Sequence, residues 1–286
     1  MIIDAHCHAG EAEKHFSKHF AETLYVPLGL PPNAMHVDIQ KVIANADAAG
    51  VSKTFLMAHD MTRIWESKCP NEYVAEIVKK HPDRFIGFAS VDPLGGLRAV
   101  KELETAVNEL GLKGLKFLPA FADLPSNDPR VFPIYETAQD LKIPVNIHMG
   151  WLPIGHMKDQ DPMLIDDIAI EFPKLKIIVA HAGFHWATSC FLLMKKHANV
   201  YADLALWFLL FPIEWIARHL SMAKHMGVFN KLLWGSDYPD MEPGIDIKKW
   251  REVPKESQRL GLKPDITRED MDKLLGGNAA RLVRIG

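Results

Sequence analysis

The sequence has few cysteines and no long hydrophobic run, and each shortage excludes a class of protein. Its three cysteines, Cys7, Cys69 and Cys190, form no C-x-x-C pair, so we expect neither a disulfide framework nor a thiolate zinc site. The longest apolar run, Leu204 to Ile213, falls well short of the roughly 20 residues that a membrane-spanning helix needs. No basic and apolar leader of the secretory kind is present. We therefore expect a cytoplasmic protein in a reducing compartment, without a membrane partner.

Neither sign of charge is in surplus, and phosphate-binding loops are missing. The chain has 33 Lys and Arg against 36 Asp and Glu, a formal charge of −3, which disfavours nucleic acid as a partner. No G-x-G-x-x-G and no G-x-x-x-x-G-K-[ST] motif follows a predicted strand. The composition, 48% hydrophobic and 24% charged, is that of an ordinary globular protein. A small molecule is the expected partner.

Short β-rich apolar runs alternate with amphipathic helical segments along the whole chain. The predicted strands lie near Met1–Ala5, Lys53–Ala58, Phe85–Val91, Lys113–Leu118, Ile143–His148, Lys176–His181, Asn199–Asp203 and Lys231–Ser236. Gly50, Gly111 and Gly227 each stand where a helix is expected to end. Eight strand–helix repeats in 286 residues predict a (β/α)8 TIM barrel of the α/β class, forming a single domain over residues 1–286. An open doubly wound sheet is the alternative.

The connection between the first strand and the first long helix is unusually long. It runs from His8 to His36, so a candidate lid loop covers about residues 9–36. Loops of this length in compact domains are usually functional. We therefore interpret this segment as an active-site lid.

Metal-compatible side chains follow the predicted strands at their carboxyl ends. His6 and His8 end the first strand, His148 the fifth, His181 the sixth, and Asp237 the eighth. In a closed barrel all strand carboxyl ends meet at one mouth, so we expect these five side chains to lie close together. Imidazole and carboxylate groups suit Zn²⁺ and similar divalent ions. The pattern predicts a metalloenzyme.

Five motifs, in this order along nearly the whole chain, resemble those of the amidohydrolase superfamily. They are Ile3-Asp4-Ala5-His6-Cys7-His8, Asn146-Ile147-His148, Val179-Ala180-His181-Ala182-Gly183, Trp234-Gly235-Ser236-Asp237-Tyr238-Pro239 and Gly277-Asn278-Ala279-Ala280-Arg281-Leu282. More narrowly, they resemble the amidohydrolase-related branch, which includes aminocarboxymuconate semialdehyde decarboxylase. The combination is specific for the superfamily and says little about the reaction.

The resemblance implies a (β/α)8 barrel that holds one divalent ion, usually zinc, with manganese as the alternative. Its metal ligands would be His6, His8, His148 and Asp237. His181 would contact the metal-bound water, and Asp237 would double as the proton acceptor, which makes these two the expected catalytic residues.

Three further residues are expected to bind substrate. Lys116 belongs to the fourth predicted strand and points into the barrel mouth if Leu115 and Phe117 face the helices. It would then bind an anionic group of the substrate or, as in binuclear relatives of the superfamily, be carbamylated and bridge two metals. Arg63 and Trp151 lie on loops that follow strands, where they would contact a carboxylate and a flat ligand.

The leading hypothesis is a metal-dependent hydrolase in which activated water attacks a small aromatic or carboxylate-bearing substrate. The alternative is a carboxy-lyase, a nonoxidative decarboxylase of an aromatic or unsaturated acid. A non-catalytic metal- or ligand-binding barrel is the third reading. The resemblance and the apolar run Leu204–Phe211 also suggest a homodimer, although the run would equally serve as core.

Overall fold

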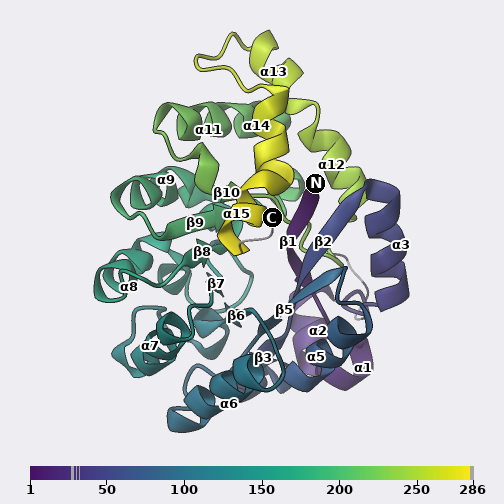
Figure 1. Cartoon of the computed structure of the whole chain (residues 1–286), viewed down its shortest axis with the longest axis vertical. Helices are drawn as coiled ribbons and strands as arrows, with labels where there is room; N and C mark the ends of the chain where they lie inside the picture. Colours follow the sequence, from purple (N-terminus) through teal and green to yellow (C-terminus); the bar gives the residue numbers. More distant parts are fainter. Residues whose placement is uncertain (27–28, 30, 32, 284–286) are drawn as a thin grey trace.

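The computed structural model describes residues 1–26, 29, 31 and 33–283. Its main sheet has eight parallel strands whose order follows the chain. The strands are β1 (Ile2–His8), β2 (Val51–Met57), β5 (Phe85–Ala89), β6 (Gly114–Phe117), β7 (Val145–Ile147), β8 (Ile177–Val179), β9 (Val200–Asp203) and β10 (Leu232–Leu233). The Ala5 amide donates to the Trp234 carbonyl at 2.9 Å, so β1 and β10 close the sheet into a barrel. The predicted (β/α)8 fold is confirmed (Figure 1).

Helices surround the barrel and cover its outer face (Figure 1). The longer α-helices are α3 (Ile39–Ala49), α5 (Asn71–Lys80), α6 (Leu97–Asn108), α7 (Phe132–Asp140), α8 (Ile165–Glu171), α9 (Ala187–Lys196), α11 (Ile213–His225), α12 (Pro243–Trp250) and α13 (Val253–Arg259). The others are α1 (Ala12–His15), α2 (Lys18–Leu24), α4 (Thr62–Trp65), α10 (Trp207–Leu210), α14 (Arg268–Asp272) and α15 (Asn278–Val283). Tight 3-10 turns are η2 (Pro119–Ala122), η3 (Pro129–Val131), η4 (Met157–Gln160), η5 (Pro162–Leu164), η6 (Ala180–Trp186) and η7 (Phe229–Lys231), and η8 (Lys273–Gly277) is a wider π-helical turn.

The helix ends follow the local sequence. Asp38 caps α3 by accepting from two amides of the first turn, and Gly50 ends it with a positive φ of 73°. Gly111 and Gly227 also adopt positive φ, as expected of glycines that terminate helices. Thr267 opens α14 with a reciprocal capping box. The helices end at these residues, and the chain then returns to the barrel.

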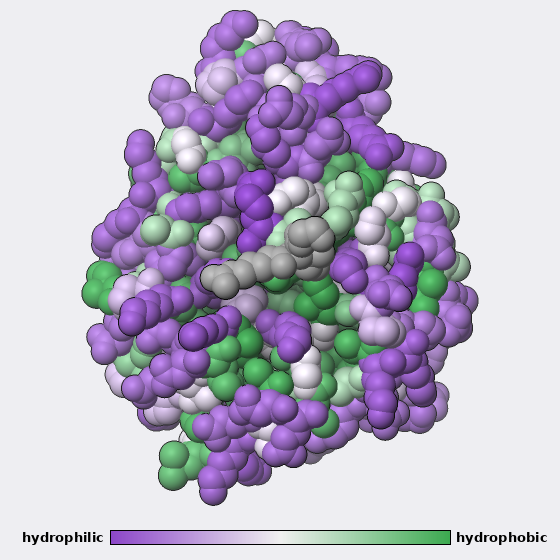
Figure 2. All heavy atoms as spheres, in the orientation of Figure 1, coloured by the Kyte–Doolittle hydropathy of each residue, from purple (hydrophilic) through white to green (hydrophobic). Residues whose placement is uncertain are grey.

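The barrel wall separates two apolar layers. The outer one packs the strands against the helices and includes Leu56, Val145 and Val179. The inner one lies inside the barrel and joins strand residues to α15. Its buried members are Ile3, Ala5, Phe55, Met57, Phe88, Ile178, Leu233, Ala279 and Leu282. Hydrophilic side chains dominate the face of the molecule in Figure 2.

The segment between β1 and α3, predicted as a lid over residues 9–36, contains the short helices α1 and α2. Phe16, Phe20 and Leu24 from this segment form a separate apolar cluster with Trp65 and Phe121. The segment thus has a small core of its own at the barrel mouth. Residues 27, 28, 30 and 32 of the predicted lid lie outside the described residues, and its movement stays a prediction.

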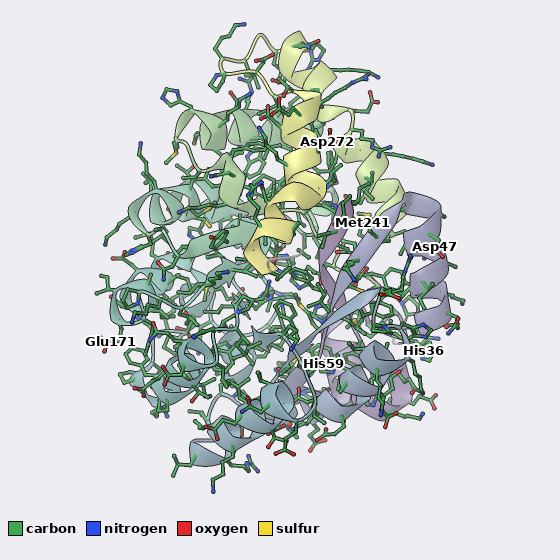
Figure 3. All side chains as sticks on the ribbon, in the orientation of Figure 1. His36, Asp47, His59, Glu171, Met241 and Asp272 are labelled. Atoms are coloured by element: carbon green, nitrogen blue, oxygen red, sulfur yellow. The ribbon has the colours of Figure 1, made fainter. Side chains whose placement is uncertain are left out.

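A second departure from the simple repeat follows β2. The antiparallel hairpin of β3 (His59–Met61) and β4 (Ser67–Cys69) is an insertion that the strand prediction did not include. Figure 3 places His59 within the body of the molecule, whereas Asp47 and Glu171 project from its outer edge. Within the described part of the chain, no helix has the length and apolar character to span a membrane.

Candidate metal centre and active site

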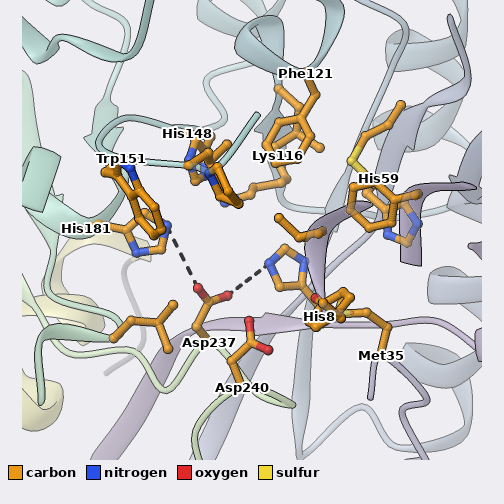
Figure 4. Close-up of a pocket in the computed structure, with 18 of the residues that line it drawn as sticks. His8, Met35, His59, Lys116, Phe121, His148, Trp151, His181, Asp237 and Asp240 are labelled. Atoms are coloured by element: carbon orange, nitrogen blue, oxygen red, sulfur yellow. Dashed lines mark hydrogen bonds and ion pairs between the residues drawn. The ribbon is translucent and has the colours of Figure 1, made fainter. Parts of the chain in front are cut away.

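The structure brings four of the predicted residues into contact around one carboxylate. Oδ1 of Asp237 lies 3.3 Å from Nε2 of His6 and 3.0 Å from Nε2 of His8. Its Oδ2 lies 3.8 Å from Nε2 of His181 (Figure 4). The ligand atoms of His6, His8 and Asp237 all lie within 4.8 Å of one another. Strands from opposite ends of the sequence therefore supply one compact donor set.

A β-bulge in β1 aims its two histidines. Asp4 pairs with Thr54 of β2, but the next pair is Cys7 with Leu56, so β1 holds one extra residue between them. The bulge breaks the strict alternation of side chains. Ile3 and Ala5 consequently contribute to the inner apolar layer, while His6 and His8 face the mouth.

The bulge also changes the place of Asp4, which simple alternation would put beside the His6 ring. Its carboxylate instead accepts from the Ser236 hydroxyl at 2.6 Å and the Ser236 amide at 2.8 Å. It contacts His6 only through the backbone amide, at 3.2 Å. Asp4 therefore ties the first strand to the segment that carries Asp237.

His148 follows β7 directly and is buried at the same mouth. Its ring centroid lies 5.0 Å from that of His181 and 5.3 Å from that of Phe121. Among the described residues, its Nε2 has no hydrogen-bond partner. A buried imidazole nitrogen without a partner is costly unless a ligand or ion completes it. His148 is also absent from the two donor groups whose atoms lie within 4.8 Å of one another.

Asp203 is a site residue that the sequence analysis did not single out. It ends β9, is completely buried, and lies 3.1 Å from Nδ1 of His6 through its Oδ2. Asn146 donates to the same oxygen at 2.8 Å, and the amides of His181 and Ala205 donate to Oδ1 at 3.0 and 3.2 Å. These four donors occupy the carboxylate, so it orients the site, and its oxygen also belongs with His6 and His181 to the second group of donor atoms within 4.8 Å of one another. Its position as the last residue of a predicted strand was the signal that the sequence offered.

Hydrogen bonds to Nδ1 fix which nitrogen of each ring faces the mouth. His6 donates from Nδ1 to Asp203, and His181 donates from Nδ1 to the Ala205 carbonyl at 3.2 Å, because neither partner oxygen carries a proton to give. In both neutral rings the lone pair is therefore on Nε2, toward Asp237. The backbone at His181 and at Asp237 has a φ of 57°, in the left-handed region that residues other than glycine rarely adopt.

Lys116 of β6 points into the barrel mouth, as the alternation of its strand predicts. Its side chain is buried, and Nζ donates to Nε2 of His6 at 2.8 Å and to Oδ1 of Asn146 at 3.0 Å. Burial lowers the pKa of Lys116 to about 8, against the opposing attraction of Asp237 and Asp203. Lys116 and a bound cation would therefore compete for the lone pair on Nε2 of His6.

Burial favours the neutral form of His148 and His181. It lowers the pKa of His181 to about 4 and the pKa of His148 well below its ordinary value. Burial works in the opposite direction on Asp237, but the neighbouring imidazoles of His6 and His8 hold the pKa of that carboxyl well below its usual range. Near pH 7 the site thus offers neutral imidazoles and a carboxylate, the protonation states that metal ligands require.

These donors fit a divalent cation. Nε2 of His6 and Oδ1 of Asp237 are both acceptors, and they face each other at 3.3 Å in a buried site. Two electron-rich atoms at this distance repel unless a positive charge lies beside them; here the Lys116 ammonium supplies it at 2.8 Å, and a bound cation would take its place. The unpaired Nε2 of His148 completes a set of nitrogen and oxygen donors that suits zinc or manganese. An ion bound by His6 would displace the Lys116 ammonium from its lone pair.

The centre opens into a cavity of about 400 Å³ at the carboxyl ends of the strands. Trp151, predicted to contact substrate, lines this cavity (Figure 4). Arg63, predicted to grip a carboxylate, is absent from the described lining. Its guanidinium makes two hydrogen bonds to Asp92, at 3.1 and 2.7 Å. The structure therefore gives Arg63 an internal partner away from the centre.

Comparison with known proteins agrees with the motifs. A family model described as Amidohydrolase matches residues 3–285. A 2-amino-3-carboxymuconate-6-semialdehyde decarboxylase from Dictyostelium discoideum is 29% identical over 133 residues, 40% of this chain and 36% of that protein. A gamma-resorcylate decarboxylase from a Polaromonas species is 33% identical over 100 residues, 31% of this chain and 29% of that protein. The matched stretches thus span about a third of these curated relatives.

Solved structures share the whole barrel at low identity. An uncharacterised TIM-barrel protein from Bordetella bronchiseptica has a TM-score of 0.78 and 20% identity, covering 99% of this chain and 98% of that one. A dihydroxybenzoic acid decarboxylase from a Polaromonas species, with bound manganese and the inhibitor 2-nitroresorcinol, has a TM-score of 0.70 and 18% identity, covering 99% and 97%. These likenesses support the fold. Because the family model spans nearly the whole chain, the chain belongs to the amidohydrolase family.

Proposed function

We propose that the protein is a metal-dependent decarboxylase that removes carbon dioxide from an aromatic or unsaturated acid. The observation that carries this proposal is the match to two curated decarboxylases. The apolar cavity beside the centre supports it, because such walls suit a flat carbon skeleton. Hydrolysis, which the motifs put first, is the second candidate, since the same donor set would activate water.

The cofactor would be one divalent ion. In this proposal His6, His8, His148 and Asp237 hold it, and it supplies Lewis-acid polarisation of an oxygen of the bound acid. The nitrogen and oxygen donors suit both zinc and manganese. Lys116, released from His6, binds an oxygen anion of the substrate, and Trp151 packs against its flat body.

The chain's own residues would handle the proton. Asp237, a carboxylate in the resting site, would first take up a proton by way of His181 and then give it to the carbon that bears the substrate carboxylate, which forms a new C–H bond. The bond to the carboxylate carbon then breaks, its electron pair returns to the carbon skeleton, and carbon dioxide leaves. His181, whose Nε2 lies 3.8 Å from Asp237, returns a proton from solvent to the carboxylate. The net reaction consumes one proton and no water.

The isotope content of the product tests this proposal. Protein stripped of metal and reloaded with zinc or manganese is incubated with hydroxybenzoates, muconate-type acids, lactones and amides. We expect release of one carbon dioxide per product and, in D₂O, one deuterium at the carbon that lost the carboxylate. Products that carry ¹⁸O from labelled water, without carbon dioxide, would establish the hydrolase instead.

A further inference from the structure

The polar groups of the cavity are distributed unevenly. His8, Lys116, His148, His181 and Asp237 all belong to the metal centre, at one end. In the described lining, Lys116 is the one lysine or arginine side chain. The cavity therefore offers positive charge to an anion only where the centre lies.

Apart from Tyr25, His59 and Asp240, the remaining described walls are apolar. They come from the segment before α3, from the turn after β6 and from the segments after β8 and β9, and they include Phe16, Phe20, Leu118, Phe121, Phe184 and Leu206. Several of these side chains are aromatic and packed in place, with the Phe20 and Phe121 ring centroids 6.3 Å apart. A carboxylate buried against these apolar side chains would lose its hydration without gaining a hydrogen-bond donor from them, which is strongly unfavourable.

Among the described lining residues, no positive charge outside the centre relieves this deficit. Arg63, the arginine that follows β2 in the sequence, is held by Asp92 at 2.7 Å, and Arg98 lies 3.2 Å from the same carboxylate. Asp240 lines the cavity, and Figure 4 shows its carboxyl beside that of Asp237. In either protonation state Asp240 offers no positive charge to a second anionic group.

Apolar side chains continue from the interior to the opening. Trp151, Leu209 and Leu210 line the cavity and yet are 37%, 58% and 41% exposed. A substituent that points away from the metal centre would therefore meet hydrocarbon along its whole path to solvent. An apolar substituent gains from this contact, and a charged one loses.

We propose that the cavity selects acids with a single carboxylate on a flat, otherwise apolar body, and that it rejects acids with a second carboxylate opposite the first. The inference rests on the proposed function in that the carboxylate of the substrate binds at the metal centre. It specifies which acids bind in the cavity, a question that the choice between decarboxylase and hydrolase does not answer.

The test compares three acids that differ only in the group para to the carboxylate: 2-hydroxybenzoate, 2-hydroxy-4-propylbenzoate and 2-hydroxybenzene-1,4-dicarboxylate. Equilibrium dialysis against manganese-loaded protein, with chromatography of each acid and its product, measures binding separately from turnover. We expect the propyl compound to bind at least about fivefold tighter than the parent acid. The dicarboxylate should bind weaker by about 50-fold or more.

A charge placed at the opening provides a second arm. Trp151→Arg should fold, because the side chain is 37% exposed, and should recover at least about tenfold in dicarboxylate binding relative to 2-hydroxybenzoate. Leu192→Arg is the matched control, since Leu192 is 56% exposed on α9 and absent from the described cavity lining. The control should leave the ratio unchanged.

The outcomes separate this inference from the proposed reaction. Equal binding of the dicarboxylate and the parent acid by the parent protein would overturn the inference, even if carbon dioxide is released. The expected binding order without carbon dioxide release would support the inference and count against the decarboxylase. Recovery of dicarboxylate binding by Leu192→Arg to the same extent as by Trp151→Arg would also overturn it, because general surface charge would then explain the effect.

Discussion

The carboxylate of Asp203 lies 3.1 Å from Nδ1 of His6, and both side chains are completely buried. This contact keeps the proton on Nδ1, so that Nε2 of His6 faces Asp237 as a lone pair. Carboxylate partners of this kind orient metal-binding histidines and raise their basicity. Asp203 thereby connects β9 to a ligand on β1 without reaching the centre itself.

Replacement of this partner should weaken the metal site. For Asp203→Asn we expect metal affinity to fall by about 10- to 100-fold, because the amide is a poorer acceptor for His6 and for the His181 amide. Competition with a chelator measures the change. Asp246→Asn is the control, since Asp246 is a buried carboxylate that accepts from Trp234 and Trp250 at 2.6 and 3.0 Å, away from the centre. Equal metal loss in both variants would contradict the role of Asp203.

Substitutions at Asp237 and His181 should lower catalytic activity more than they lower metal binding. Asp237→Asn keeps an oxygen near the metal but removes the proton carrier, so activity should fall by about 10²- to 10⁴-fold while metal content falls less. His181→Asn should retain most of its metal, since His181 lies 3.8 Å from Asp237 and its role is proposed to be proton transfer. Metal analysis and turnover are measured on the same samples. If Asp237→Asn stays within a few-fold of the parent in turnover, the proton carrier must be another group, and His181 is the first candidate.

The sequence predicted the barrel because its alternation of strands and helices repeats eight times with clear helix ends such as Gly50. The donor residues could be placed at one mouth because strand carboxyl ends converge in that fold. The contacts of Asp4 and Asp203 could not be predicted, since they depend on a one-residue bulge in β1 and on the register of β9 beside β10. Arg63 could not be placed either, because its partner Asp92 lies beyond the next strand in the sequence.

Lys116 should compete with the metal for His6. In Lys116→Met the ammonium that donates to Nε2 of His6 at 2.8 Å is gone, so one divalent ion should bind more tightly than in the parent. Loss of a charged hydrogen bond to substrate should raise KM by about 10- to 100-fold. Chelator competition, metal stoichiometry and steady-state kinetics measure these effects. Loss of one of two metal equivalents in the variant would instead show that a carbamylated Lys116 bridges two ions.

His59 gives a prediction about acid stability. Burial, with the charge of His8 as a smaller cause, lowers the pKa of His59 to about 3 from an ordinary value of 6.5. Below about pH 6.5 this histidine becomes protonated in the unfolded chain, whereas in the folded chain it becomes protonated only near pH 3. Lowering the pH through this range therefore favours the unfolded state, and the stabilisation that neutral His59 provides is lost as the pH falls. Above pH 6.5 both states are neutral there, and the contribution does not change with pH.

His59→Gln should therefore flatten the acid side of the stability profile. We expect the free energy of unfolding of metal-free protein to fall less between pH 6.5 and pH 4 than in the parent, by up to about 1.4 kcal/mol per pH unit. At pH 7.5 the variant should be less stable, because the His59 ring stacks on Phe16 at 4.4 Å. Urea unfolding at several pH values measures both effects, with exposed His225→Gln as the control. Because the other buried histidines remain in the variant, a profile parallel to that of the parent would show that His59 is protonated in the folded protein.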